Sequence, residues 1–126
     1  MLCVADYLDA LSWVESLGGT QAVIEKSQEN LRVIADFVDA NDWIQFLAKD
    51  AATVSNTSIC LAVDAPADQV KAMIKLLDAE GVAYDIGAYR DAPAGLRIWG
   101  GATVESADLE ALMPWLAWAY QEVTAA

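Results

Sequence analysis

The segment from Thr57 to Val63 constrains the fold most strongly, because it is predicted to be a strand that leads directly into a helix. Its sequence, Thr-Ser-Ile-Cys-Leu-Ala-Val, is rich in residues that favour strands. Asp64-Ala-Pro66 follows at once and is typical of a helix start, with proline near the first turn. Gly81 supplies the left-handed stop that commonly ends a helix. The chain therefore combines a sheet with helices.

Three more segments are predicted to be strands. Residues 43–48 are short, apolar and partly aromatic, and residues 82–87 and 96–100 flank a turn that contains Pro93 and Gly95. Strands joined by short turns favour antiparallel pairing. We therefore expect a small, mainly antiparallel sheet of about four strands.

Apolar residues at spacings of three and four predict two helices before the first strand. The first covers residues 4–17 and is broken by Gly18-Gly19. Thr20 is the expected N-cap of the second, which ends near Asn41-Asp42.

Ser106 is the expected cap of a last helix, which Pro114 should kink. The predicted order is thus α-α-β-β-α-β-β-α. We expect one α+β domain over residues 1–126, a two-layer sandwich with the helices on one face of the sheet.

Charge and composition exclude several classes of function. The formal net charge of −12 disfavours nucleic acids and anionic membranes as partners. No apolar run reaches the ~18 residues of a transmembrane helix, and the first residues lack the basic region of a signal peptide, so we expect a cytoplasmic protein. The mean hydropathy of +0.30 favours an apolar face that meets another domain or subunit.

Classical nucleophile and metal chemistry is also disfavoured. The chain has no histidine and only two cysteines, Cys3 and Cys60, so Ser-His and Cys-His pairs and the usual zinc sites are excluded. No metal site is expected. The four lysines, Lys26, Lys49, Lys71 and Lys75, lie in no context that predicts the desolvated pocket of a Schiff-base lysine.

The densest cluster of functional side chains is residues 84–101. Arg97 stands between Leu96 and Ile98, so strand alternation places it on the opposite face of the sheet. A guanidinium on so acidic a chain is a candidate clamp for a carboxylate or phosphate. Arg90 lies in the preceding turn beside Tyr89, whose phenol can add a hydrogen bond.

Two alternatives remain open at this point. Arg97 can instead form a structural ion pair with Asp85 or Glu105. Gly100-Gly101 can form a phosphate-binding nest, or can simply end a strand.

The same cluster carries a resemblance to a known family. Residues 81–105 are similar to a motif near the C-terminus of phosphoserine aminotransferases, and the similarity includes residues 4–11, 55–61 and 108–116. The resemblance implies the C-terminal small domain of a class V, fold-type-I enzyme. Such enzymes move an amino group from glutamate to 3-phosphohydroxypyruvate in serine biosynthesis, use pyridoxal phosphate held by a lysine of a large domain, and act as homodimers.

The resemblance also implies roles for individual residues. Arg97 matches the arginine that holds the substrate α-carboxylate. Arg90 and Tyr89 match a basic pair that helps to hold the substrate phosphate, although Tyr89 replaces the usual histidine and the turn that follows is one residue longer.

No catalytic residue is expected in this chain. The cofactor lysine and the large domain are expected upstream of Met1, which would be an internal methionine of a longer protein. The chain alone is then expected to bind no cofactor and to be inactive. Two other functions remain open, a stand-alone module that binds a small anion and a protein-interaction module.

Overall fold

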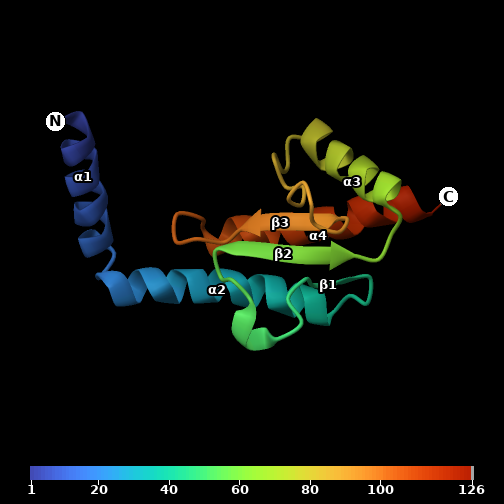
Figure 1. Cartoon of the computed structure of the whole chain (residues 1–126), viewed down its shortest axis with the longest axis horizontal. Helices are drawn as coiled ribbons and strands as arrows, with labels where there is room; N and C mark the ends of the chain where they lie inside the picture. The colour runs from blue at the N-terminus through green and yellow to red at the C-terminus, as the bar shows by residue number, and fades with distance from the viewer. Residues whose placement is uncertain (126) are drawn as a thin grey trace.

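Three antiparallel strands form the sheet in the computed structural model, which describes residues 1–125 (Figure 1). They are β1 (Ile44–Phe46), β2 (Ser58–Val63) and β3 (Gly95–Trp99), in the order β1-β2-β3. Ile59 lies opposite Ile98 and Leu61 opposite Leu96. The register therefore gathers the apolar side chains on one face, as period-two alternation requires.

Three helices cover this apolar face: α2 (Thr20–Asp39), α3 (Ala67–Ala79) and α4 (Ser106–Thr124). Each helix contributes fully or almost fully buried side chains to the common core, among them Ile34, Met73 and Leu116. A short 3-10 helix, Ala51–Thr53, lies between β1 and β2. The predicted α+β class, with helices on one face of an antiparallel sheet, is confirmed.

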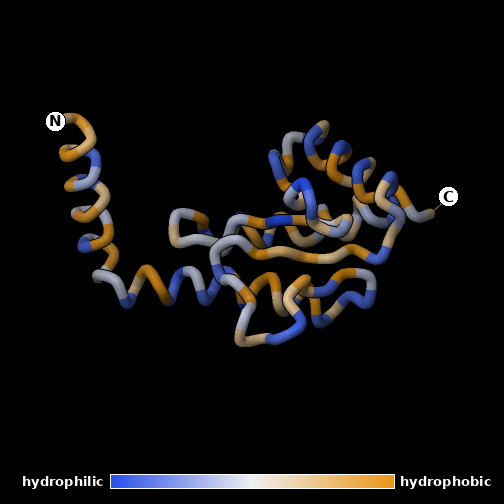
Figure 2. Tube along the Cα trace, viewed as in Figure 1, coloured by the Kyte–Doolittle hydropathy of each residue, from blue (hydrophilic) through white to orange (hydrophobic). Residues whose placement is uncertain are grey.

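Helix α1 (Leu2–Ser16) projects away from this body (Figure 1) and has no buried side chain. Figure 2 shows hydrophobic residues along its whole length. Gly18 and Gly19 follow with φ angles of +107° and +85°, values that suit glycine and that break the helix as predicted. Several large apolar side chains of α1 are exposed, among them Leu2, Tyr7 and Leu8, and such a surface is typical of an interaction site.

The predicted strand at residues 82–87 is wrong. Only Gly87 forms a bridge to β3, opposite Leu96, while buried Ile86 accepts a hydrogen bond from the Arg97 N–H (2.8 Å). Asp85 has a φ of +52°, which interrupts the extended backbone that a strand needs. The sheet thus has three strands, and the order of helices and strands is α-α-β-β-α-β-α.

Two of the predicted helix ends also need correction. Gly19, not Thr20, is the N-cap of α2, because the glycine itself makes the break and the helix begins directly after it. Glu105, not Ser106, is the N-cap of α4. Ser106 uses its hydroxyl to donate to the side chain of Asn30 (2.9 Å) rather than to cap its own helix.

The predicted helix stop at Gly81 is confirmed. Gly81 has a φ of +69° just after α3, which is the left-handed stop expected there. Helix α4 runs through Pro114 as one continuous helix, and the kink expected there stays a prediction. Within residues 1–125, no helix combines the length and the apolar character that a membrane crossing requires.

Candidate functional site

The candidate site lies on the face of the sheet that the helices leave open. Cys60 of β2 stands opposite Arg97 of β3, and Ser58 stands opposite Trp99. Arg97 is placed there because its neighbours Leu96 and Ile98 turn into the core. The predicted position of Arg97 on the far face is therefore confirmed.

Arg97 is held by two residues of the segment that precedes β3. Its Nη2 donates to the Asp85 carboxylate at 3.0 Å and to the Asp85 carbonyl oxygen at 3.5 Å. The Tyr89 ring lies over the guanidinium, with 4.7 Å between the ring centroid and Cζ. Of the two alternative partners considered from sequence, Asp85 is the one that pairs, whereas Glu105 pairs with Lys26 (2.9 Å).

Tyr89 connects Arg97 to β2. Its hydroxyl lies 3.0 Å from Ser58 Oγ. The Ser58 hydroxyl, and after it Arg97, hold the pKa of the Tyr89 phenol below its ordinary value. The Tyr89 phenol, and after it the Asp85 carboxylate, raise the pKa of the Arg97 guanidinium, which therefore stays charged. Sequence reasoning missed Ser58, although it alternates with buried Ile59 in a predicted strand.

One donor of Arg97 is unused. The Nε atom is buried and has no hydrogen-bond acceptor among the described residues, while Asp85 engages Nη2 only. A carboxylate normally binds arginine through two parallel hydrogen bonds. The guanidinium therefore has an unused donor, which neighbouring atoms cover in this structure.

A pocket of about 470 Å³ opens beside this arginine. Asp85, Arg97 and Trp99 line it together with the start of α4, including Asp108. The pocket is thus bordered by one cation and two carboxylates.

The structure does not place Arg90 in this pocket. Arg90 is exposed and lines a second pocket, of about 300 Å³, together with Lys71 of α3. Neither cation makes an ion pair within residues 1–125. Of the three residues predicted from sequence, Tyr89 and Arg97 are in contact, while Arg90 faces a separate cationic hollow that also includes a residue, Lys71, that sequence reasoning missed.

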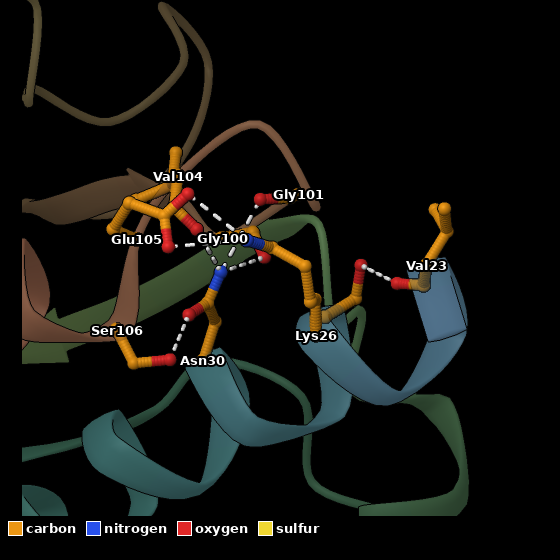
Figure 3. A network of polar contacts seen from close by, with 9 residues as sticks. Val23, Lys26, Asn30, Gly100, Gly101, Val104, Glu105 and Ser106 are labelled. Carbon is orange, nitrogen blue, oxygen red and sulfur yellow. Dashed lines mark hydrogen bonds and ion pairs between the residues drawn. The ribbon is translucent and has the colours of Figure 1, made fainter. Parts of the chain in front are cut away.

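A buried amide fixes the loop that leaves β3 (Figure 3). Asn30 of α2 is fully buried, and its Nδ2 donates to the carbonyls of Gly100 (3.0 Å), Gly101 (3.2 Å) and Val104 (3.0 Å). The Gly100 N–H donates to the Thr57 carbonyl (2.7 Å), so it is not available to an anion nest. A signal for Asn30 existed in the sequence, because Ser27, Asn30 and Ile34 follow helical spacing on the buried face of α2.

The lysines do not fit a covalent cofactor site. Lys26 donates to Glu105, and Lys49, Lys71 and Lys75 are exposed. A lysine that forms a Schiff base needs a desolvated or cationic environment to lower its pKa. None of these four has a buried ammonium group, so no chemical step is assigned to them.

Solved structures share this fold. Part of the phosphoserine aminotransferase from Bacillus circulans subsp. alkalophilus matches 88% of this chain with a TM-score of 0.78 and 21% identity, and the match covers 30% of that enzyme. A second solved structure, from a study of radiation damage of the Schiff base in phosphoserine aminotransferase, also matches 88% of this chain, with a TM-score of 0.76 and 17% identity. The architecture is thus that of one part of an aminotransferase.

The sequence comparison is more specific. The chain is 51% identical over 123 residues to phosphoserine aminotransferase of Methanosarcina mazei and 50% identical to that of Methanosarcina barkeri. Each match takes in 98% of this chain and 33% of the relative, so the chain spans about a third of their length. It matches no protein-family model. The resemblance to phosphoserine aminotransferases is confirmed over nearly the whole chain.

Proposed function

We propose that this chain is the substrate-binding, C-terminal small domain of a phosphoserine aminotransferase. One observation carries the proposal: over 98% of its length, the chain is 51% and 50% identical in sequence to two enzymes of that name. The reaction transfers an amino group between glutamate and 3-phosphohydroxypyruvate. Pyridoxal phosphate, bound by the rest of such an enzyme, supplies the electron sink for this chemistry.

Arg97 binds the substrate carboxylate in this proposal. It stands on the open face of the sheet at the edge of the pocket of about 470 Å³, and it stays positively charged. A guanidinium held in place by its surroundings orients a carboxylate by two hydrogen bonds, which positions the amino or keto carbon beside it.

Arg90 and Lys71 bind the substrate phosphate. Both line one hollow of about 300 Å³, on a chain whose net charge is −12. Tyr89 lies between the two arginines, since it lines this hollow and also covers Arg97. The two anionic groups of one substrate then lie on either side of Tyr89.

The proposed partners are the large, cofactor-binding part of the enzyme and a second subunit, in a cytoplasmic homodimer. Exposed apolar residues on α1, among them Leu8 (57% exposed) and Tyr7 (65% exposed), supply a surface for such contacts. The same surface also supports the second candidate, a protein-interaction module whose docking element is α1.

A chimera tests the proposal. The matching third of the Methanosarcina mazei enzyme is replaced by this chain, and amino transfer from glutamate to 3-phosphohydroxypyruvate is measured. We expect an active enzyme, in which Arg97→Ala raises KM about 10- to 100-fold, the effect of losing hydrogen bonds to a charged group.

Arg32→Ala is the matched control, because Arg32 is an exposed arginine of α2 whose ion pairs within residues 1–125 are those with Glu29 and Asp36. It removes the same charge and should leave KM unchanged. The proposal fails if the chimera folds and takes up the cofactor but transfers no amino group. It also fails if Arg97→Ala behaves like Arg32→Ala.

A further inference from the structure

The guanidinium of Arg97 is already occupied by a carboxylate of the same chain. Asp85 Oδ2 lies 3.0 Å from Arg97 Nη2, and both residues line the pocket of about 470 Å³. A ligand that enters this pocket and reaches for Arg97 meets the Asp85 carboxylate at the same nitrogen. The aspartate therefore takes the place that a ligand carboxylate needs.

The ion pair with Asp85 does not use all the donors of Arg97. Both hydrogen bonds to Asp85 use Nη2, and the buried Nε has no acceptor among the residues that the structure describes. Arginine prefers to bind a carboxylate through both nitrogens of this edge, and a ligand can do so here once Asp85 leaves Nη2 and the atoms that cover Nε move aside.

The ion pair is also weak, because the Asp85 carboxylate is exposed to water. The Asp85 side chain is 93% exposed, while that of Arg97 is 29% exposed. An ion pair that water reaches contributes little, because both charges remain well solvated when they separate. Asp85 also has a φ of +52°, a backbone angle that few residues other than glycine, asparagine and aspartate adopt readily.

We infer that Asp85 is an internal competitor that sets the affinity of Arg97 for carboxylate ligands. A ligand carboxylate must displace the Asp85 carboxylate from Nη2 before it can bind there. Tyr89 acts with it, because the ring over the guanidinium belongs to the same segment between α3 and β3. This inference rests on the proposed carboxylate-binding role of Arg97.

The test follows the Nε–H signal of Arg97 by NMR while the chain is titrated with sodium acetate. Sodium chloride at equal ionic strength serves as the reference, and the signal is assigned by its loss in Arg97→Lys. Asp85→Asn keeps the shape and the backbone preference of the side chain. Asp85→Gly is a second variant, which removes the carboxylate and also suits the positive φ.

Both variants should bind acetate with a Kd about two- to five-fold lower than the unmodified chain, the range that one exposed ion pair contributes. Asp91→Asn is the matched control, since it removes one negative charge from the same segment and Asp91 has no ion pair within residues 1–125. Its Kd should not change.

Two results would overturn the inference. If Asp85→Asn and Asp85→Gly bind acetate no more tightly than Asp91→Asn, the competitor role is lost, while an active chimera still supports the proposed function. If acetate never moves the Arg97 signal in any variant, carboxylate binding by Arg97 is itself refuted in this chain. The chimera then decides separately whether the wider function stands.

Discussion

Replacing Asn30 by alanine tests the idea that one buried side chain holds the end of β3 in place. Asn30 is fully buried and serves four partners. The carbonyl of Gly101 keeps another donor, the Val104 N–H at 2.9 Å. The substitution therefore leaves the Gly100 carbonyl, the Val104 carbonyl and the Ser106 hydroxyl without the partner that Asn30 supplied.

The magnitude follows from these three groups. A buried polar group that loses its partner costs about 1–3 kcal/mol, less where water enters the space that the side chain leaves. We expect a loss of about 3 kcal/mol in the free energy of unfolding. For a domain of this length, 1 kcal/mol lowers Tm by roughly 4 °C, so Tm should fall by roughly 12 °C.

Thermal unfolding followed by circular dichroism measures this change. Ser106→Ala removes one of the four contacts and should cost about 1 kcal/mol. Lys26→Gln breaks a second, more exposed link between α2 and the same loop, the ion pair with Glu105, and should cost at most about 1 kcal/mol. If Asn30→Ala melts within the range of Lys26→Gln, the network does not hold the loop and the reasoning is refuted.

Asn30→Asp adds a test of mechanism. An ionised carboxylate would face three carbonyl oxygens where the amide donates, and burial without a partner penalises the charge. We expect Asn30→Asp to be less stable than Asn30→Ala at neutral pH. It should recover part of its stability in acid, where the protonated side chain becomes a donor. Equal stability of the two variants at every pH would contradict this account.

Two predictions concern other positions. The phenol of Tyr89 should titrate below the ordinary value of ~10, and Ser58→Ala should raise its pKa, because Ser58 is the largest cause of the shift and Arg97 the next. A lowered pKa stabilises the fold only at alkaline pH: the contribution is complete above the unfolded pKa, disappears as the pH falls through the folded pKa, and is absent at neutral pH. Phenolate absorbance during a pH titration, with Tyr89→Phe as the reference, measures the shift, and an unmoved midpoint in Ser58→Ala would contradict the assignment. Gly95→Ala should destabilise the domain by about 3 kcal/mol in thermal unfolding, because its Cβ would lie 2.0 Å from the Leu61 carbonyl oxygen, and a melting curve like that of the parent would show that the strands can separate at no cost.

Local patterns account for the elements that the sequence predicted well. The spacing of apolar residues identified the helices, and alternation within residues 96–98 placed Arg97 on the open face. These patterns succeed because helical and extended backbones fix the direction of a side chain within a few residues. The resemblance to phosphoserine aminotransferases was likewise present in the sequence and is now supported by relatives of about half identity.

The segment between α3 and β3 was predictable only in part. Residues 82–87 have the composition of a strand, but Asp85 adopts a left-handed angle and pairs with Arg97 instead. Whether an aspartate in such a position joins a sheet or turns toward a cation depends on what lies across from it. Composition alone carries no such information.

The sequence by itself thus determined the class of fold, the face on which Arg97 lies and the similarity of the chain to phosphoserine aminotransferases. Only the tertiary structure decided that Asp85 occupies Arg97, that Arg90 joins Lys71 in a separate hollow, and that Asn30 holds a loop 70 residues away. The physical reason is distance along the chain. Local preferences act over a few residues, whereas these contacts exist only after packing against the common core has brought remote segments together.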